Sequence, residues 1–81
     1  MQLSELPLHT PAIVQGVDDT ASTDPIANRL RELGFVAGEP VRIVAQGPVG
    51  REPLLIQIGY TRFALRRAEA ARVRVQPERA E

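Results

Sequence analysis

Short segments in which apolar and polar residues alternate recur along the chain and predict β-strands. The clearest is residues 72–75, where Val73 and Val75 alternate with Arg72 and Arg74. A period of two places successive side chains on opposite faces of a strand, so both Val are expected inward and both Arg outward. The predicted strands, separated by turns rich in Gly and Pro, are residues 12–17, 41–46, 54–58, 62–66 and 72–75.

One segment instead shows the spacing of an amphipathic helix. Asp24 or Thr23 can cap free N–H groups, Pro25 fits the first helical position, and Gly34 fits the left-handed residue that ends a helix. We therefore predict one helix over about residues 24–33, covering a sheet. Its apolar stripe, with spacings of four and three, is Ile26, Leu30 and Leu33.

The remaining segments carry weaker signals. Leu3, Leu6 and Leu8, interrupted by Pro7, predict an extended segment that pins apolar side chains onto the body of the fold. Gly16 within the first strand predicts a bulge or a sharp bend. Three further segments are interpreted as a turn at residues 47–50, a single helical turn at 68–71 and a frayed polar tail from residue 76.

Five short strands with one helix between the first and the second favour a small closed barrel over an open sheet. Closure would hide strand edges that otherwise invite aggregation. The predicted fold class is therefore mainly β, a five-stranded barrel with one α-helix inserted between strands 1 and 2. A chain of 81 residues is expected to form one domain, here residues 1–76, followed by a polar tail at 77–81.

Composition excludes several kinds of protein. The chain has no Cys, which rules out a disulfide framework and a thiolate zinc site. The N-terminus has no basic segment followed by an apolar run, so we predict no secretory signal. No stretch approaches the roughly 20 apolar residues that span a bilayer. We expect a cytoplasmic location without direct membrane insertion.

Charge is distributed unevenly although the formal net charge is zero. Residues 1–40 hold six acidic and two basic residues, a net of −4, whereas residues 41–81 hold eight Arg and four Glu, a net of +4. Every basic residue is Arg, which makes bidentate contacts that Lys does not. These complementary halves suggest that docking to a partner is partly electrostatic.

Residues that could carry chemistry are few. His9 is the only His, and one His without Cys cannot build a strong transition-metal site. Asp18, Asp19 and Asp24 do not follow a calcium-loop pattern, so capping and solvated-loop roles are favoured. No Ser or Thr has an evident basic partner, and no phosphate-binding Gly-rich loop is present. We expect no catalytic residue, no metal site and no cofactor.

The order of several short motifs resembles the FeoA family over about residues 3–75. Residues 29–38 (RLRELGFVAG) are similar to its RL-x-ELG stretch, and residues 59–70 (GYTRFALRRAEA) to its GY…ALR…EA signature. Leu3 and Leu6 resemble its leucine-bearing N-terminal segment. The turn at 47–53 and the strand at 72–75 occupy the places of its loop and closing strand.

This resemblance implies an SH3-like barrel and a role in bacterial ferrous-iron uptake. It also implies a partner: FeoB, a membrane protein with a cytoplasmic GTP-binding domain, which would hold this chain at the inner membrane. Two turns depart from the family pattern. Residues 7–11 lack the usual Gly after the leucines, and residues 50–53 (GREP) lack the usual Asp before Pro. Both departures concern loop contacts rather than the fold.

Two surfaces are candidates for docking such a partner. The first surrounds the C-terminal end of the helix, at Arg29, Glu32, Phe35 and Val36, with Leu55 as a further apolar candidate. The alternative is that Phe35 and Val36 only seal the helix onto the barrel.

The second surface is a basic ridge near the end of the chain. Arg62 and Arg66 share one strand face, as do Arg72 and Arg74, and the ridge forms if those strands are neighbours. Such a ridge with stacking aromatic residues can bind nucleic acid. Zero net charge and a single nearby Tyr60 favour solvated faces or protein docking, so we expect no nucleic-acid partner. A metal-sensing barrel, as in the C-terminal domain of iron-dependent repressors, stays an alternative, and weak self-association stays open.

Overall fold

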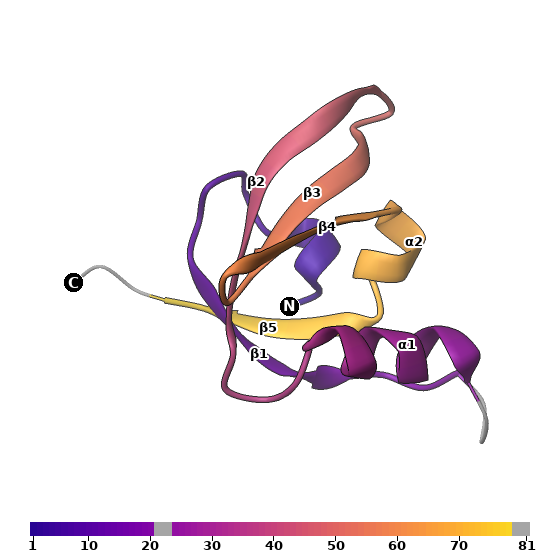
Figure 1. Cartoon of the computed structure of the whole chain (residues 1–81). Helices are drawn as coiled ribbons and strands as arrows, with labels where there is room; N and C mark the ends of the chain where they lie inside the picture. Colours follow the sequence, from indigo (N-terminus) through magenta and orange to yellow (C-terminus); the bar gives the residue numbers. More distant parts are fainter. Residues whose placement is uncertain (21–23, 79–81) are drawn as a thin grey trace.

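Five antiparallel strands, one helix of nine residues and two shorter helical turns build the protein (Figure 1). The computed structural model describes residues 1–20 and 24–78. In chain order the elements are the 3₁₀ turn η1 (Leu3–Glu5), β1 (Ala12–Val17), α1 (Pro25–Leu33), β2 (Pro40–Val49), β3 (Glu52–Ile58), β4 (Thr61–Leu65), α2 (Arg67–Ala70) and β5 (Val73–Pro77). The predicted class, mainly β with a helix between the first two strands, is confirmed.

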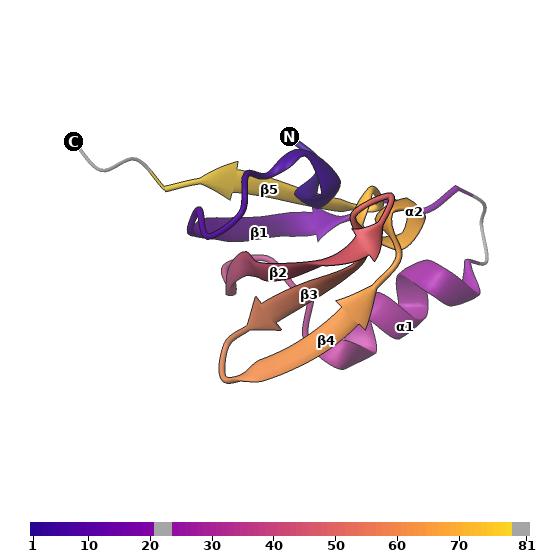
Figure 2. The ribbon, with the colours of Figure 1, turned by 90° about the horizontal axis from the view of Figure 1, so that it is seen from above.

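The strands form one curled sheet in the order β4-β3-β2-β1-β5, which can be followed in Figure 2. Every neighbouring pair is antiparallel. The pairing of β1 with β5 shifts register between Val14 and Gly16, so the predicted irregularity at Gly16 is confirmed. The sheet is barrel-like but not closed, because β4 and β5 are its two edges and do not pair with each other. The expectation of complete closure is therefore wrong.

Alternation along the strands builds the core. Val73 and Val75 are buried while Arg74 between them is exposed, as the period of two predicted. Phe35, which follows the helix, is fully buried, and its ring lies 6.3 Å from that of Phe63 in a tilted arrangement. The largest fully buried side chains are Phe35, Leu3, Ile43, Leu54, Ile56, Val14, Val73 and Val75.

Helix α1 begins and ends where its sequence signals indicate. The Asp24 carboxylate accepts hydrogen bonds from the N–H groups of Ile26 and Ala27, at 3.1 and 3.2 Å. Pro25 occupies the first turn, and Gly34 has φ +115°, the left-handed region that glycine adopts without steric cost. Asp24 is thus the cap, while Thr23 lies outside the described residues.

Strand β2 continues to Val49, through most of the segment predicted as a turn at residues 47–50. Gly47 does not break the strand. A side-chain carbon at this position would lie 1.9 Å from the Glu52 carbonyl oxygen, so glycine is needed for the close approach of two backbones. The register shift between Gln46 and Val49 accommodates Pro48, which has no N–H to donate.

The two ends of the chain also differ from expectation. Residues Leu3–Glu5 form a 3₁₀ turn rather than an extended segment, and Leu3 and Leu6 are buried while Leu8 is 40% exposed. Gln76 and Pro77 pair with β1 as part of β5, so no fraying begins at Gln76. Residues 79–81 of the expected tail lie outside the described residues.

Candidate functional site

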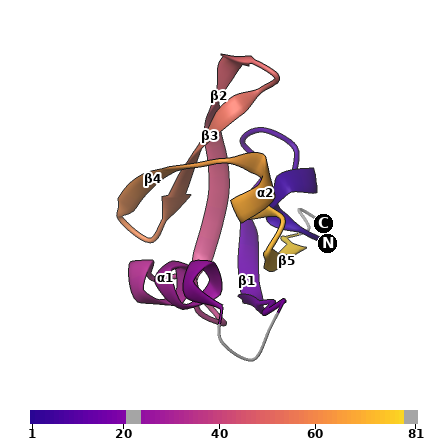
Figure 3. The ribbon, with the colours of Figure 1, turned by 90° about the vertical axis from the view of Figure 1, so that its right-hand side faces the viewer.

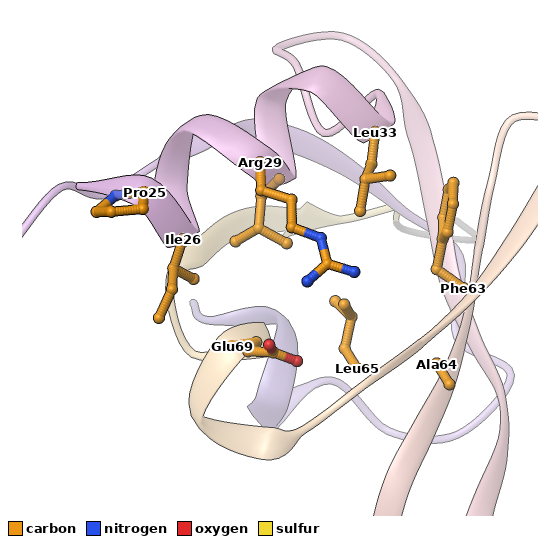
Figure 4. A pocket seen from close by; sticks show the side chains of 9 residues that line it. Pro25, Ile26, Arg29, Leu33, Phe63, Ala64, Leu65 and Glu69 are labelled. Carbon is orange, nitrogen blue, oxygen red and sulfur yellow. The ribbon is translucent and has the colours of Figure 1, made fainter. Parts of the chain in front are cut away.

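A groove lined largely by apolar side chains lies between α1 and β4 (Figure 4). Its volume is about 230 Å³. Figures 2 and 3 show α1 and β4 on the same side of the molecule, away from β5. The lining residues are Pro25, Ile26, Arg29, Leu30, Leu33, Phe63, Ala64, Leu65 and Glu69.

The groove exists because the apolar stripe of α1 is wider than the face that α1 buries. Ala27 and Leu30 are fully packed into the core. Ile26 remains 41% exposed and Leu33 half-buried, so both line the groove instead. On the opposite wall, Phe63 is half-buried. These side chains leave an apolar surface that water covers in the isolated protein.

Two charged residues lie at the groove, one from each helix (Figure 4). Arg29 extends its guanidinium from α1 across the hollow, and Glu69 faces it from α2. The Glu69 carboxylate accepts a hydrogen bond from the Arg66 N–H at 2.9 Å and so caps α2. Among the residues that the structure describes, Arg29 has no carboxylate within ion-pair distance.

The patch predicted around the helix end is only partly at the surface. Arg29 lines the groove and Glu32 is exposed, as expected of a docking surface. Val36 is 46% exposed, whereas Phe35 is completely buried. Phe35 therefore cannot contact a docked partner in this conformation, because its ring fills the core between α1 and the sheet. Leu55 is half-buried on β3, away from the groove.

The expected basic ridge does not form. Arg62 lies on β4 and Arg74 on β5, at opposite ends of the strand order. Arg62 donates to the Gln57 side chain at 3.2 Å, Arg74 pairs with Asp18 at 2.6 Å, and Arg66 lies at a separate hollow near the β2–β3 hairpin. The three Arg therefore belong to separate surfaces rather than to one ridge.

Asp24 is the one buried charged residue among those described. Its carboxylate accepts hydrogen bonds from the N–H and the hydroxyl of Thr20, both at 2.9 Å, and forms an ion pair with Arg72. The Thr20 backbone N–H, the Ala27 N–H, the Thr20 hydroxyl and the Arg72 charge together hold the pKa of Asp24 well below its ordinary value, against the opposing effect of burial. Asp24 is thus a structural carboxylate with all its partners inside the chain.

Within residues 1–20 and 24–78, no three side chains of His, Cys, Asp or Glu lie close enough together to hold a metal ion. Asp18 and Asp19 each pair with an Arg, at 2.6 and 2.9 Å. His9 is exposed in a turn with φ +69°. No helix of the described residues is long and apolar enough to cross a membrane.

Sequence reasoning located Arg29 but missed most of the groove. The spacing predicts that Ile26 and Leu33 lie on the covered face of the helix, and no sequence signal marks Ala64 or Glu69 as part of a surface site. One signal could have indicated the groove: an apolar stripe that includes Ile26, Leu30 and Leu33 as well as Ala27 is broader than a single small sheet covers. The opposite wall could not be predicted, since it depends on where β4 lies relative to α1.

Comparison with known proteins bears on both fold and function. The model of the FeoA domain family matches residues 1–77. FeoA of Stenotrophomonas maltophilia in complex with zinc is 67% identical, with a TM-score of 0.86, over 94% of this chain and 89% of that chain. It is described as a procaryotic SH3 domain protein with a suggested role as a bacterial ferrous iron transport activating factor. Among curated proteins, no sequence matches the chain.

More distant structures share the architecture. Iron(II) transport protein A from Clostridium thermocellum is 30% identical over 95% of this chain and 45% of that chain, with a TM-score of 0.80. IdeR of T. acidophilum is 15% identical over 96% of this chain and 34% of that chain, with a TM-score of 0.74, a likeness of fold alone. The family match spans every strand and helix described above. The chain therefore belongs to the FeoA family.

Proposed function

We propose that the protein is a non-catalytic regulator of bacterial ferrous-iron uptake that acts by binding a FeoB-type membrane protein through its cytoplasmic GTP-binding domain. Membership of the FeoA family and the role suggested for the Stenotrophomonas maltophilia relative support the pathway. The proposal places the chain in the cytoplasm, at the membrane surface only through this partner.

The observation that carries the docking role is the groove between α1 and β4. Its walls present the partly exposed Ile26, Leu33 and Phe63. The guanidinium of Arg29, which has no carboxylate partner among the described residues, extends across the hollow. Aromatic and Arg side chains near the centre of an interface typically contribute most of the binding energy between proteins, and this groove offers Phe63 and Arg29. The described groove also lacks the pairing of a nucleophile with a base that catalysis requires.

The direct test is binding of the full chain to the purified GTP-binding region of a FeoB-type protein, with GDP and with a non-hydrolysable GTP analogue. We expect a complex at low salt, and we expect Arg29→Glu to weaken it about tenfold or more, as loss of a central interface charge does. Arg42→Glu is the matched control, because Arg42 is exposed on β2 and lies at a different hollow. Absence of binding in every nucleotide state would overturn the proposed function.

A further inference from the structure

The two edges of the sheet are not equally protected. Outside β5, the N-terminal residues cover the strand: Gln2 forms a β-bridge with Arg74, and the Val75 N–H donates to the Met1 carbonyl at 2.8 Å. Beyond β4, the described residues place no strand and no bridge. Unpaired edges are normally blocked because they accept strands from other chains. The edge of β4 is therefore the one that stays available.

The register of the β3–β4 hairpin identifies the backbone groups that face outward. A two-residue turn at Gly59 and Tyr60 joins the strands, with Ile58 opposite Thr61. In such a hairpin the pair flanking the turn is hydrogen-bonded, and pairs then alternate along the ladder. The N–H and C=O groups of Arg62 and Ala64 consequently point away from β3, toward the free edge.

The free edge of β4 adjoins the apolar groove. Phe63 and Leu65 direct their side chains toward the core, whereas Arg62 and Ala64, which alternate with them, are exposed. A strand added beside β4 would continue the same pleat, so that every second side chain would face α1. Those side chains would enter the hollow formed by Ile26 and Leu33, whereas the alternating ones would face solvent next to Arg62.

The charges near the edge of β4 indicate which residue types an added strand would carry. Neither Arg29 nor Arg62 has a carboxylate partner among the described residues, and Glu69 already caps α2. Opposite charges on neighbouring strands attract each other, and like charges directly opposite are destabilising. Acidic residues at the outward positions therefore complement Arg62, whereas Arg29 lies on the groove side.

We propose that β4 receives an extended segment of a partner protein, in which apolar residues alternate with acidic ones, as an additional antiparallel or parallel strand. Main-chain hydrogen bonds to Arg62 and Ala64 would supply affinity, and the groove would select apolar side chains at alternate positions. This inference deepens the proposed function, on which it rests only for the identity of the partner. A second copy of this chain fits less well, because pairing β4 with itself brings two Arg62 side chains to one face.

The test uses nuclear magnetic resonance of the full chain with a capped peptide of sequence Glu-Val-Glu-Leu-Glu-Val-Glu. We expect shifts concentrated at the amides of Arg62 and Ala64 and the methyls of Ile26 and Leu33, with those amides gaining protection from hydrogen exchange. A peptide with Lys in place of Glu should bind more weakly. One carrying N-methyl groups on the alternate residues whose N–H groups face β4 should not bind, because those residues can no longer donate to the carbonyl oxygens of Arg62 and Ala64.

The variant Ala64→Pro provides a second test. It removes an N–H that points away from β3 and that the fold itself does not use, and edge strands tolerate Pro at such positions. It should weaken peptide binding about five- to tenfold, the effect of one lost hydrogen bond, while Ala64→Ser should not. Equal binding of the N-methylated peptide, shifts located elsewhere, or no shifts at millimolar peptide would overturn the proposal. So would concentration-dependent shifts at β4 without peptide, which would assign the edge to a second copy.

The FeoB-type region separates this inference from the proposed function. If that region binds the native chain and Ala64→Pro equally, the edge proposal is wrong and the regulator proposal stands. If it binds neither, while the peptide shifts appear as expected, the edge proposal stands and the regulator proposal is wrong. The N-methylated peptide needs no protein variant, so the edge proposal remains falsifiable even if Ala64→Pro fails to fold.

Discussion

At the scale of single residues, Asp24 connects the first turn of α1 to Arg72, far along the chain. Its carboxylate caps α1, accepts two hydrogen bonds from Thr20 and pairs with Arg72, 48 residues away. A buried carboxylate is tolerated only when its oxygens are satisfied, and here several donors share it. The same side chain therefore defines the start of the helix and attaches the helix to the segment before β5.

This geometry predicts how stability depends on pH. Because the pKa of Asp24 is lower in the folded protein than its ordinary value of 3.8, the contribution of its charge is fully present above pH 3.8 and is lost as pH falls below it. Asp24→Asn keeps a capping oxygen but removes the charge. We expect the variant to have a lower melting temperature at neutral pH, with the difference from the native chain shrinking below pH 3.8.

Thermal unfolding followed by circular dichroism between pH 7 and pH 2.5 measures this difference. Asp19→Asn is the control, because Asp19 forms an exposed ion pair with Arg31. It should change the melting temperature less than Asp24→Asn at neutral pH. A difference in melting temperature between the native and Asp24→Asn proteins that stays constant across the whole pH range would contradict the lowered pKa of Asp24.

Gly47 is the second residue that the fold constrains directly. A methyl group there would overlap the Glu52 carbonyl, and backbone cannot yield as a side chain tip can. Gly47→Ala should lower the free energy of unfolding by about 1–3 kcal/mol, the usual cost of forcing atoms into a packed site. Val49→Ala, at an 81% exposed position of the same hairpin, should stay within about 0.5 kcal/mol. Urea denaturation of both variants checks the contrast.

At the scale of elements, the apolar residues of α1 have two different roles. Ala27 and Leu30 hold the helix to the sheet, while Ile26 and Leu33 line an open groove. Stability should therefore depend on the first pair and partner binding on the second. Strand β4 shows the same division, because Leu65 is buried in the core and Ala64 lies at the exposed edge.

Two alanine variants test this division of α1. Leu30→Ala should lower the free energy of unfolding by about 2–5 kcal/mol, since it leaves a cavity in the core. Ile26→Ala should lower it by less than about 1 kcal/mol, because this side chain is 41% exposed. Partner binding should respond to Ile26→Ala even so. Equal destabilisation by both variants would show that Ile26 also holds the helix in place.

At the scale of the whole molecule, acidic residues of the first half form ion pairs with basic residues of the second half. Asp18 pairs with Arg74 and Asp24 with Arg72, so each pair joins the acidic half to the basic half. The net charges of −4 and +4 in the two halves are therefore weaker support for electrostatic docking to a partner than the sequence suggested. Two Arg have no carboxylate partner among the described residues: Arg29 at the groove and Arg62 on β4.

A charge swap tests whether these pairs join the halves. Arg74→Glu places two negative charges together. Because the pair is exposed, we expect the free energy of unfolding, measured by urea denaturation, to fall by up to about 1 kcal/mol. Combining it with Asp18→Arg should restore most of the loss at low salt. A double variant no more stable than Arg74→Glu would show that the attraction between these residues contributes nothing.

Local signals in the sequence determined the elements and the class of fold. A capping carboxylate, Pro25 and Gly34 define the ends of α1 because they act on backbone within a few residues. Alternation determined which side chains of β5 enter the core, since the pleat allows only two faces. The motif order indicated the FeoA family, which comparison confirmed.

Only the tertiary structure decided which surfaces come together. The predicted Arg ridge required β4 and β5 to be neighbours, and strand order depends on packing across the whole sheet rather than on spacing in either strand. Burial of Phe35 and exposure of Ile26 likewise depend on how far the sheet extends beneath α1. The sequence thus determined what each segment is, because those interactions are local. The groove and the free edge of β4 follow from contacts between segments that lie far apart in the chain.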